Sequence, residues 1–293
     1  MLQSFPPEGI NGSTLPGERQ KLPLEVWRSF ADKASFDEWF FANSHLWIPD
    51  TIESIVSAVR RNGLVDPFLG NISPENIKIE GGNYRETIYF AGAKSRGRAL
   101  LHLLKSIILQ KGADLAVYGS EAVSEFSERL RKLFPAYVGS EYLPGVMREK
   151  FPSVRHEDVQ FLSFASNSFD IVISCEVLEH IPFIDLALLE TKRVLRDGGI
   201  FLGTVPFALG SATSTVKARM WDGEVQYLME PEYHGNPVDP TVGSLVFEIP
   251  GWNLLEQMKS AGFRDAKIHF IMSSTMGIVA PGTGGILCFV AQA

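Results

Sequence analysis

Along residues 168–206 the spacing of hydrophobic residues is first typical of a strand, then of a helix, and then of a strand again. Residues 171–173 form a β-branched run of the kind that makes a buried parallel strand. Apolar side chains then recur at helical spacing over residues 184–195, which predicts a helix with an apolar stripe against a sheet. Asp197-Gly198-Gly199 is expected to end that helix, because glycine adopts the left-handed backbone of a carboxyl-terminal cap, and residues 200–205 predict the next strand. Together they predict a right-handed βαβ unit whose strand-end loops share one edge of the sheet.

The same alternation of strand and helix precedes this unit. Residues 114–119 predict a strand, residues 125–133 a helix and residues 137–140 a second strand, which is followed by Glu141. An acidic side chain roughly 20 residues beyond the first strand can accept hydrogen bonds from both hydroxyls of a ribose. Glu141 lies 22 residues after Gly119 and is therefore the predicted ribose ligand, with a plain surface glutamate as the alternative.

The amino-terminal third predicts a mainly helical cap over residues 1–111. Residues 1–23 form a lead-in rich in proline and glycine. Residues 36–47 hold a dense aromatic cluster, which either packs as core or lines a substrate site. Asp50 is expected to cap the start of a helix, and Gly63 is expected to end it.

Composition narrows the class of protein. Of 293 residues, 45% are hydrophobic and 21% are charged, as in ordinary globular proteins. The net charge of −7 argues against nucleic acid as a partner, because phosphate binding needs a basic surface. Two cysteines, Cys175 and Cys288, form neither a disulfide framework nor a metal site, which favours a reduced, cytoplasmic location. The chain shows no secretion signal and no run of 18 apolar residues, so no membrane is expected as a partner.

A resemblance to a known family rests on two motifs. Residues 169–180 read Phe-Asp-Ile-Val-Ile-Ser-Cys-Glu-Val-Leu-Glu-His, and residues 193–199 read Arg-Val-Leu-Arg-Asp-Gly-Gly ahead of a strand. Together they resemble the class I S-adenosylmethionine-dependent methyltransferases, of the methyltransferase type 11 kind. Within that group the likeness is to bacterial enzymes of small molecules, such as saccharides and secondary metabolites. The resemblance implies a Rossmann-like α/β fold with a seven-stranded, mostly parallel sheet and an antiparallel carboxyl-terminal hairpin of residues 267–272 and 286–291.

The resemblance also implies a division of the chain into a cap and a catalytic domain. Residues 112–293 would form the domain that binds S-adenosylmethionine, and residues 206–250 would form a lid over the substrate. Polar and aromatic side chains of this lid are the candidates for binding the acceptor molecule. They are Arg219, Trp221, Tyr233 and Asn236.

The cofactor site implied by the resemblance follows the strand ends. The cofactor ligands would be Gly119, Glu141, Tyr142, Asp158, Val159, Cys175 and Glu176. One departure weakens the match, because the family usually carries a Gly-x-Gly-x-Gly-like loop after the first strand. Gly119-Ser120-Glu121 keeps one glycine and adds a side chain that narrows the approach to the backbone. A domain that has lost catalysis, and only binds a ligand or partner, is therefore the alternative function.

Two histidines are candidates for catalysis, because an oxygen nucleophile usually needs a base within hydrogen-bond reach. By the resemblance His180 would face the methyl group, and His234 lies in a polar and aromatic turn. A structural His180 and an exposed His234 are the alternatives. Relatives often carry paired cysteines between the arginines that correspond to Arg85 and Arg96. Residues 88–95 contain none, so no metal site is expected.

The predicted function is methyl transfer from S-adenosylmethionine to a small hydroxylated acceptor, most simply O-methylation of a saccharide or secondary metabolite. A nicotinamide oxidoreductase is disfavoured, because its pyrophosphate loop would need more glycine than this chain offers. The sequence leaves open the identity of the acceptor, oxygen against nitrogen or carbon as the methylated atom, and the oligomeric state.

Overall fold

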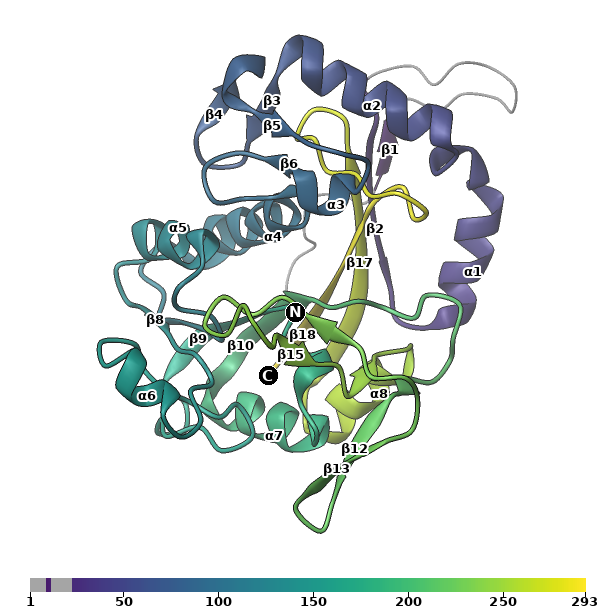
Figure 1. The fold of residues 1–293 in the computed structure, drawn as a ribbon. Coiled ribbons are helices and arrows are strands. Elements are labelled where there is room, and N and C mark those ends of the chain that lie inside the picture. The colour runs from purple at the N-terminus through teal and green to yellow at the C-terminus, as the bar shows by residue number, and fades with distance from the viewer. Residues whose placement is uncertain (1–8, 12–22) are drawn as a thin grey trace. The chain divides into compact units, whose positions relative to one another are not determined.

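The structure is a computed structural model that describes residues 9–11 and 23–293 (Figure 1). The predicted lead-in therefore lies almost wholly outside the described residues. The chain divides into two compact units. Unit 1 comprises Met1–Ala113 and Ile268–Cys288, and unit 2 comprises Asp114–Lys267 and Phe289–Ala293. Among the described residues, no helix is both long enough and apolar enough to cross a membrane.

Parallel strands form the centre of unit 2, in the order β10-β9-β7-β8 (Figure 1). Buried apolar side chains fill them, as expected for strands that are covered on both faces. β18 pairs antiparallel with β10, so the sheet is mixed. This core agrees with the predicted Rossmann-like α/β fold. Its strands are β7 (Val117–Gly119), β8 (Tyr137–Gly139), β9 (Phe169–Cys175), β10 (Leu195–Thr204) and β18 (Ile286–Gln292).

Helices α5 and α7 connect these strands, as the sequence predicts. α5 begins at Ser124, whose hydroxyl accepts the backbone N–H of Ser127 at 2.9 Å. The predicted glycine stop of α7 is wrong, because the helix ends at Val194 and the chain is already in β10 from Leu195. Gly198, with φ of +70°, instead turns the chain where the pairing of β10 is interrupted. The helical segments of unit 2 are α5 (Glu125–Leu133), α6 (Met147–Lys150), η3 (Leu178–His180), α7 (Ile184–Val194) and α8 (Asn253–Ser260).

Residues 206–250, the predicted lid, form small two-stranded sheets. The hairpin β12–β13 turns at Asp222 and Gly223, which both have positive φ, as a two-residue hairpin of the primed type requires. This hairpin extends away from the central strands (Figure 1). The strands of the segment are β11 (Thr215–Val216), β12 (Ala218–Trp221), β13 (Glu224–Tyr227), β14 (Tyr233–His234), β15 (Ser244–Leu245) and β16 (Glu248–Ile249).

Unit 1 joins helices to an antiparallel sheet in the order β1-β2-β17. The sequence analysis assigned no strand to β2, whose register with β17 runs from Glu25 opposite Ser273 to Phe30 opposite Ile268. The prediction of a mainly helical cap is therefore incomplete. Residues 268–273 of β17, one strand of the predicted hairpin, belong to unit 1. The helical segments are α1 (Lys33–Ala42), η1 (Ser44–Leu46), α2 (Pro49–Asn62), η2 (Pro74–Asn76), α3 (Tyr84–Thr87) and α4 (Ser95–Lys111). The strands are β1 (Gly9–Asn11), β2 (Glu25–Phe30), β3 (Leu64–Asp66), β4 (Gly70–Ile72), β5 (Lys78–Ile79), β6 (Ile88–Tyr89) and β17 (Asp265–Ser273).

Most rings of the aromatic cluster in the amino-terminal third pack against one another; Phe36 is buried, and Phe41 is exposed. Phe40 stacks on Trp47 with ring centroids 3.8 Å apart, and Trp39 lies 5.0 Å from Phe270. Face-to-face and edge contacts of this kind stabilise a core beyond the area they bury. The structure therefore favours the packing alternative for this cluster over a substrate-facing wall.

The ends of α2 test two further predictions. Gly63 ends the helix with φ of +78°, and its N–H reaches the carbonyl of Val59, as expected. Asp50 does not cap the start. Ile48 occupies the cap position and makes no side-chain hydrogen bond there, and Pro49 and Asp50 lie in the first turn. Proline in a first turn needs no N–H partner, which explains the earlier start.

Candidate active site

The loops after β8 and β9 carry most of the predicted site residues. Glu141 follows β8 and makes a parallel bridge with His156, so the two segments run side by side at the carboxyl end of that strand. Glu176 and His180 follow β9. Ligands of α/β proteins bind at this edge of the sheet, beyond the carboxyl ends of the strands.

The carboxylate of Glu141 is already engaged with the preceding loop. Its Oε1 accepts the N–H of Ala122 at 2.7 Å and the N–H of Val123 at 3.1 Å. Burial raises the pKa of Glu141, and the charge of Glu121 acts in the same direction, while the two backbone donors oppose the rise. Glu141 therefore fixes the loop that precedes α5 through one of its two carboxylate oxygens.

That loop packs tightly against β8. A Cβ atom at Gly119 would lie 2.2 Å from the hydroxyl of Tyr137, and a Cβ atom at Gly139 would lie 2.6 Å from the carbonyl oxygen of Glu121. The hydroxyl of Tyr137 donates to that same carbonyl at 2.8 Å. Gly119 thus serves close packing between strand and loop, in a loop that lacks the further glycines typical of the resemblance.

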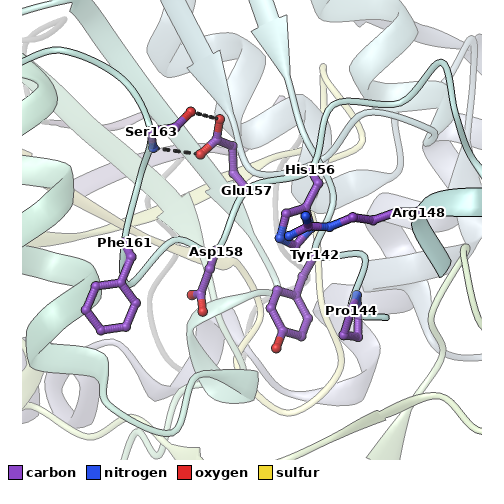
Figure 2. A pocket seen from close by; sticks show the side chains of 8 residues that line it. All are labelled: Tyr142, Pro144, Arg148, His156, Glu157, Asp158, Phe161 and Ser163. Atoms are coloured by element: carbon purple, nitrogen blue, oxygen red, sulfur yellow. Dashed lines mark hydrogen bonds between the residues drawn. The ribbon is translucent and has the colours of Figure 1, made fainter. Parts of the chain in front are cut away.

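A cavity of about 460 Å³ is lined by residues that follow Glu141 in the sequence, from Tyr142 to Ser163 (Figure 2). Figure 2 shows the carboxylate of Asp158 between the rings of Tyr142 and Phe161. Tyr142 and Asp158 were predicted from the sequence, and Phe161 was not. Oδ1 of Asp158 accepts the N–H of Gln160 at 2.9 Å, which holds the turn. The cavity is lined by Tyr142, Pro144, Arg148, His156, Glu157, Asp158, Phe161 and Ser163.

A buried carboxylate forms the rear of this cavity. Glu157 is 4% exposed and accepts hydrogen bonds from the backbone and hydroxyl of Ser163 (Figure 2) and from Arg155 at 2.7 Å. Burial alone would raise the pKa of Glu157. The hydrogen-bond donors outweigh burial, and the pKa of Glu157 is lowered. Val159, the other predicted neighbour of the adenine, is half-buried in the turn after Asp158 and does not line the cavity.

The end of β9 has an unusual backbone. Glu176 has φ of +55°, and its N–H donates to the carbonyl of Thr204 at 2.8 Å. A left-handed conformation at a residue other than glycine is uncommon and often marks a functional position. Cys175, just before it, is buried in the sheet. The structure places both predicted cofactor ligands at the carboxyl end of β9.

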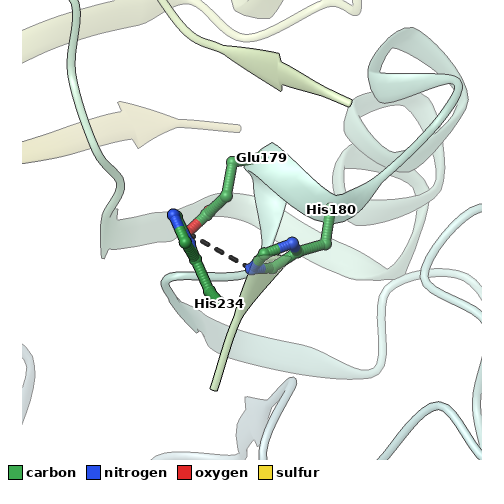
Figure 3. Close-up of side chains that lie close together, drawn as sticks. All are labelled: Glu179, His180 and His234. Carbon is green, nitrogen blue, oxygen red and sulfur yellow. Dashed lines mark ion pairs between the residues drawn. The ribbon is translucent and has the colours of Figure 1, made fainter. Parts of the chain in front are cut away.

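The two candidate bases come together at a third residue (Figure 3). Oε1 of Glu179 lies 3.6 Å from Nε2 of His180 and 3.6 Å from Nδ1 of His234. The two imidazole centroids are 5.1 Å apart and nearly perpendicular. Glu179 is fully buried, and the sequence analysis did not select it although it lies inside the motif of residues 169–180.

Each histidine also has a partner on its other ring nitrogen. Nδ1 of His180 lies 2.8 Å from the carbonyl oxygen of Leu245, and Nε2 of His234 lies 3.1 Å from a carboxylate oxygen of Glu232. Burial lowers the pKa of His180, and the neighbouring His234 lowers it further. Lys217 and His234 bond to Glu232 and lower the pKa of that carboxyl group.

The predicted acceptor ligands are not all gathered at this cluster. Arg219 and Trp221 lie on the β12–β13 hairpin, where the guanidinium carbon is 5.6 Å from the centre of the indole. Tyr233 immediately precedes His234 on β14, and its hydroxyl is 3.4 Å from that of Tyr227. The side-chain Oδ1 of Asn236 accepts the N–H of Val238 at 2.9 Å, so this amide stabilises its own turn.

One family model matches part of the chain. Residues 109–203 match a family described as a methyltransferase domain. A comparison with curated proteins gives no match.

Several solved structures are similar to this chain. A methyltransferase from Mesorhizobium loti that depends on S-adenosylmethionine is 12% identical, with a TM-score of 0.39 over 62% of this chain and 92% of that chain. A possible histamine N-methyltransferase from Thermotoga maritima is 15% identical, with a TM-score of 0.35 over 60% and 80% of the two chains. The trans-methyltransferase CalH, solved in complex with SAH, is 13% identical, with a TM-score of 0.37 over 64% and 53%.

The side chains after β8 fit the adenosine part of S-adenosylmethionine. Aromatic rings of Tyr142 and Phe161 offer faces for a purine, and Asp158 offers an acceptor for its amino group. Glu141 offers a carboxylate oxygen for ribose hydroxyls. Residues 109–203 thus match a methyltransferase domain, and the residues after β8 fit S-adenosylmethionine as its cofactor.

Proposed function

We propose that this protein transfers a methyl group from S-adenosylmethionine to a small hydroxylated acceptor, such as a saccharide or secondary metabolite. The observation that carries the proposal is the convergence of His180 and His234 on Glu179, at the strand edge that also bears the adenosine-type cavity. Proton-accepting groups on the edge proposed to hold the methyl donor would support O-methylation, which needs a base near the acceptor oxygen. The small-molecule class and a cytoplasmic location belong to the same proposal.

In this proposal the residues after β8 bind the adenosine. The free oxygen of Glu141 accepts from the ribose, Tyr142 lies against the adenine, and Asp158 accepts from its amino group with the backbone of Val159 alongside. Gly119 lets the loop lie close to the ribose. Cys175 and Glu176 lie at the methionine end of the cofactor.

The residues after β9 and in the lid act on the acceptor. The acceptor oxygen attacks the methyl carbon as the carbon–sulfur bond breaks, and an imidazole of the His180 and His234 pair takes the hydroxyl proton. His234 has the more accessible side chain, at 31% against 15% for His180. Tyr233 and its lid neighbours Arg219, Trp221 and Asn236 are proposed to contact the acceptor.

Calorimetric titration with S-adenosylhomocysteine tests the cofactor site. Glu141→Ala is expected to weaken binding at least tenfold, because a hydrogen bond to a charged group contributes about 1.5–3 kcal/mol. Glu141→Gln keeps an acceptor for the loop donors but loses the charge, so it separates ribose binding from loop anchoring. Glu149→Ala, an exposed acid on α6, is the matched control.

A binding domain without catalysis is the second candidate, and one observation favours it. Glu141 is partly engaged by its own loop, where Glu121 replaces a glycine of the resemblance. If the folded wild-type protein binds neither S-adenosylmethionine nor S-adenosylhomocysteine, the methyltransferase proposal fails. If it binds both but methylates none of a panel of hydroxylated acceptors, the binding domain is the better account.

A further inference from the structure

Three atoms of metal-ligand type converge in unit 2 (Figure 3). Glu179 and His180 belong to the short helix η3 after β9, and His234 belongs to β14. One ligand atom from each residue lies within 4.8 Å of the other two. The carboxylate oxygen of Glu179 is at the centre, 3.6 Å from a ring nitrogen of each histidine.

The hydrogen bonds of the two histidines assign their ring hydrogens. A carbonyl oxygen only accepts, so Nδ1 of His180 carries the hydrogen that faces Leu245. A carboxylate also only accepts, so Nε2 of His234 carries the hydrogen that faces Glu232. In the neutral rings, the remaining nitrogens carry lone pairs, and these are the two atoms that face Glu179. Three atoms that can each donate an electron pair thus lie close together, an arrangement that a cation between them would stabilise.

We propose that Glu179, His180 and His234 bind one divalent transition-metal ion. Two ligands about 2.1 Å from a tetrahedral metal are about 3.4 Å apart, close to the two separations of 3.6 Å. Two imidazoles and a carboxylate suit zinc, manganese, iron or cobalt rather than calcium. Three protein ligands leave a position open, as in catalytic rather than structural metal sites.

The groups behind the histidines support this assignment. Metal-binding histidines usually donate their other ring N–H to a carbonyl or carboxylate, which fixes the ring. Leu245 supplies such a carbonyl for His180, and Glu232 supplies such a carboxylate for His234. Lys217 in turn pairs with Glu232. Both histidines therefore have the outer partner that a metal ligand needs.

The sequence analysis expected no metal because a cysteine pair is absent, and the proposed site uses none. Its role in catalysis rests on the proposed function. An acceptor hydroxyl bound at the open position would lose its proton to solvent more readily, and its oxygen would then attack the methyl carbon as the carbon–sulfur bond breaks. With the ion bound, His180 and His234 act as ligands and the ion activates the hydroxyl; without the ion, one of the two imidazoles is the base, as in the proposed function.

Metal binding is tested directly on the full chain after removal of metal by a chelator. Titration with Co²⁺ is expected to give one equivalent of bound metal with visible absorption, and Zn²⁺ is expected to displace it. His234→Ala should weaken Co²⁺ binding by at least about 100-fold, because it removes a ligand rather than an outer partner. His45→Ala, outside the cluster, should leave binding unchanged.

Each outcome separates the metal site from the cofactor site. Titration of the same samples with S-adenosylhomocysteine reports on the methyltransferase proposal alone. If wild type and His234→Ala bind Co²⁺ equally well while S-adenosylhomocysteine still binds, the metal site is overturned. A proton shared among Glu179, His180 and His234 would then be the cation. Glu179→Gln is the second ligand variant, and circular dichroism confirms its fold. Loss of Co²⁺ in both folded variants, even when no S-adenosylhomocysteine binds, supports the metal site without the proposed function.

Discussion

At the residue scale, Arg98 shows how one buried charge organises its surroundings. Its guanidinium is fully buried and donates four hydrogen bonds to backbone carbonyls. Ile88 and Ala93 accept from Nη1, while Met276 and Gly277 accept from Nε and Nη2 at 2.8 Å. A planar fork with five donors suits this arrangement, and lysine could not replace it.

Arg98→Met is expected to lower the free energy of unfolding by about 3–5 kcal/mol, because four buried carbonyls lose a charged donor. Arg264→Met, which removes an exposed ion pair with Asp197, should cost less than about 1 kcal/mol. Urea unfolding of the full chain measures both. Similar midpoints for the two variants would show that the carbonyls find other donors.

His102 predicts a pH dependence of stability. Burial, with a smaller contribution from Lys105, lowers the pKa of His102 to about 4, and its ring lies 4.7 Å from that of Trp27. The unfolded chain binds this proton near pH 6.5 and the folded chain only near pH 4. Stability is therefore lost as pH falls between these values, by up to about 3 kcal/mol.

His102→Phe keeps an aromatic ring in place and removes the titration. The free energy of unfolding of this variant should fall less than that of wild type between pH 6.5 and pH 4. His45→Phe is the control and should keep the wild-type slope. Parallel pH profiles for wild type and His102→Phe would mean that His102 binds its proton as readily in the folded chain as in the unfolded chain.

Residues in the site differ in how far sequence could reveal them. Tyr142 and Asp158 were selected because the family resemblance implies them, and both line the cavity, while their contact with the cofactor stays a prediction. Glu179 was missed although it lies in the motif, because its role depends on His234, which a different element brings to it. Phe161 was missed because a single aromatic residue in a turn carries no periodic signal.

At the scale of the element, local patterns were enough for the bounds of α5 and failed for β2. α5 matches its predicted bounds, since its cap and its apolar face lie within 10 residues of one another. β2 was missed because its partner β17 lies about 240 residues later, and no local period encodes that pairing. The same reason limits any prediction of where the small sheets of the lid place their side chains.

The packing of β7, β8 and the loop between them predicts an energetic coupling. Gly119→Ala should destabilise the protein by about 1–3 kcal/mol, because its methyl group meets the Tyr137 hydroxyl. Tyr137→Phe removes that hydroxyl, so the double variant should cost less than the sum of the single variants. A double-mutant cycle from urea unfolding measures the coupling, and strict additivity would contradict the contact.

At the scale of the whole molecule, the Rossmann-like core could be predicted from the sequence, but the grouping of residues 268–288 with the amino-terminal third could not. The parallel order of β10, β9, β7 and β8 follows from successive βαβ patterns and their fixed handedness. The division of the chain after Ala113 places residues 268–288 with the amino-terminal third. Hydrophobic periodicity within those residues predicts strands, but it does not say which earlier strand they join.

This arrangement sets an order of events during synthesis on the ribosome. Ser95 and Arg98 in α4 bond to Val279, Met276 and Gly277, 178 to 184 positions later in the chain. Unit 1 therefore begins to emerge first but cannot be completed until residues 268–288 are made, and its apolar helices stay incompletely packed while residues 114–267 are translated. Contacts this distant slow folding and leave apolar surface exposed to aggregation or to chaperones.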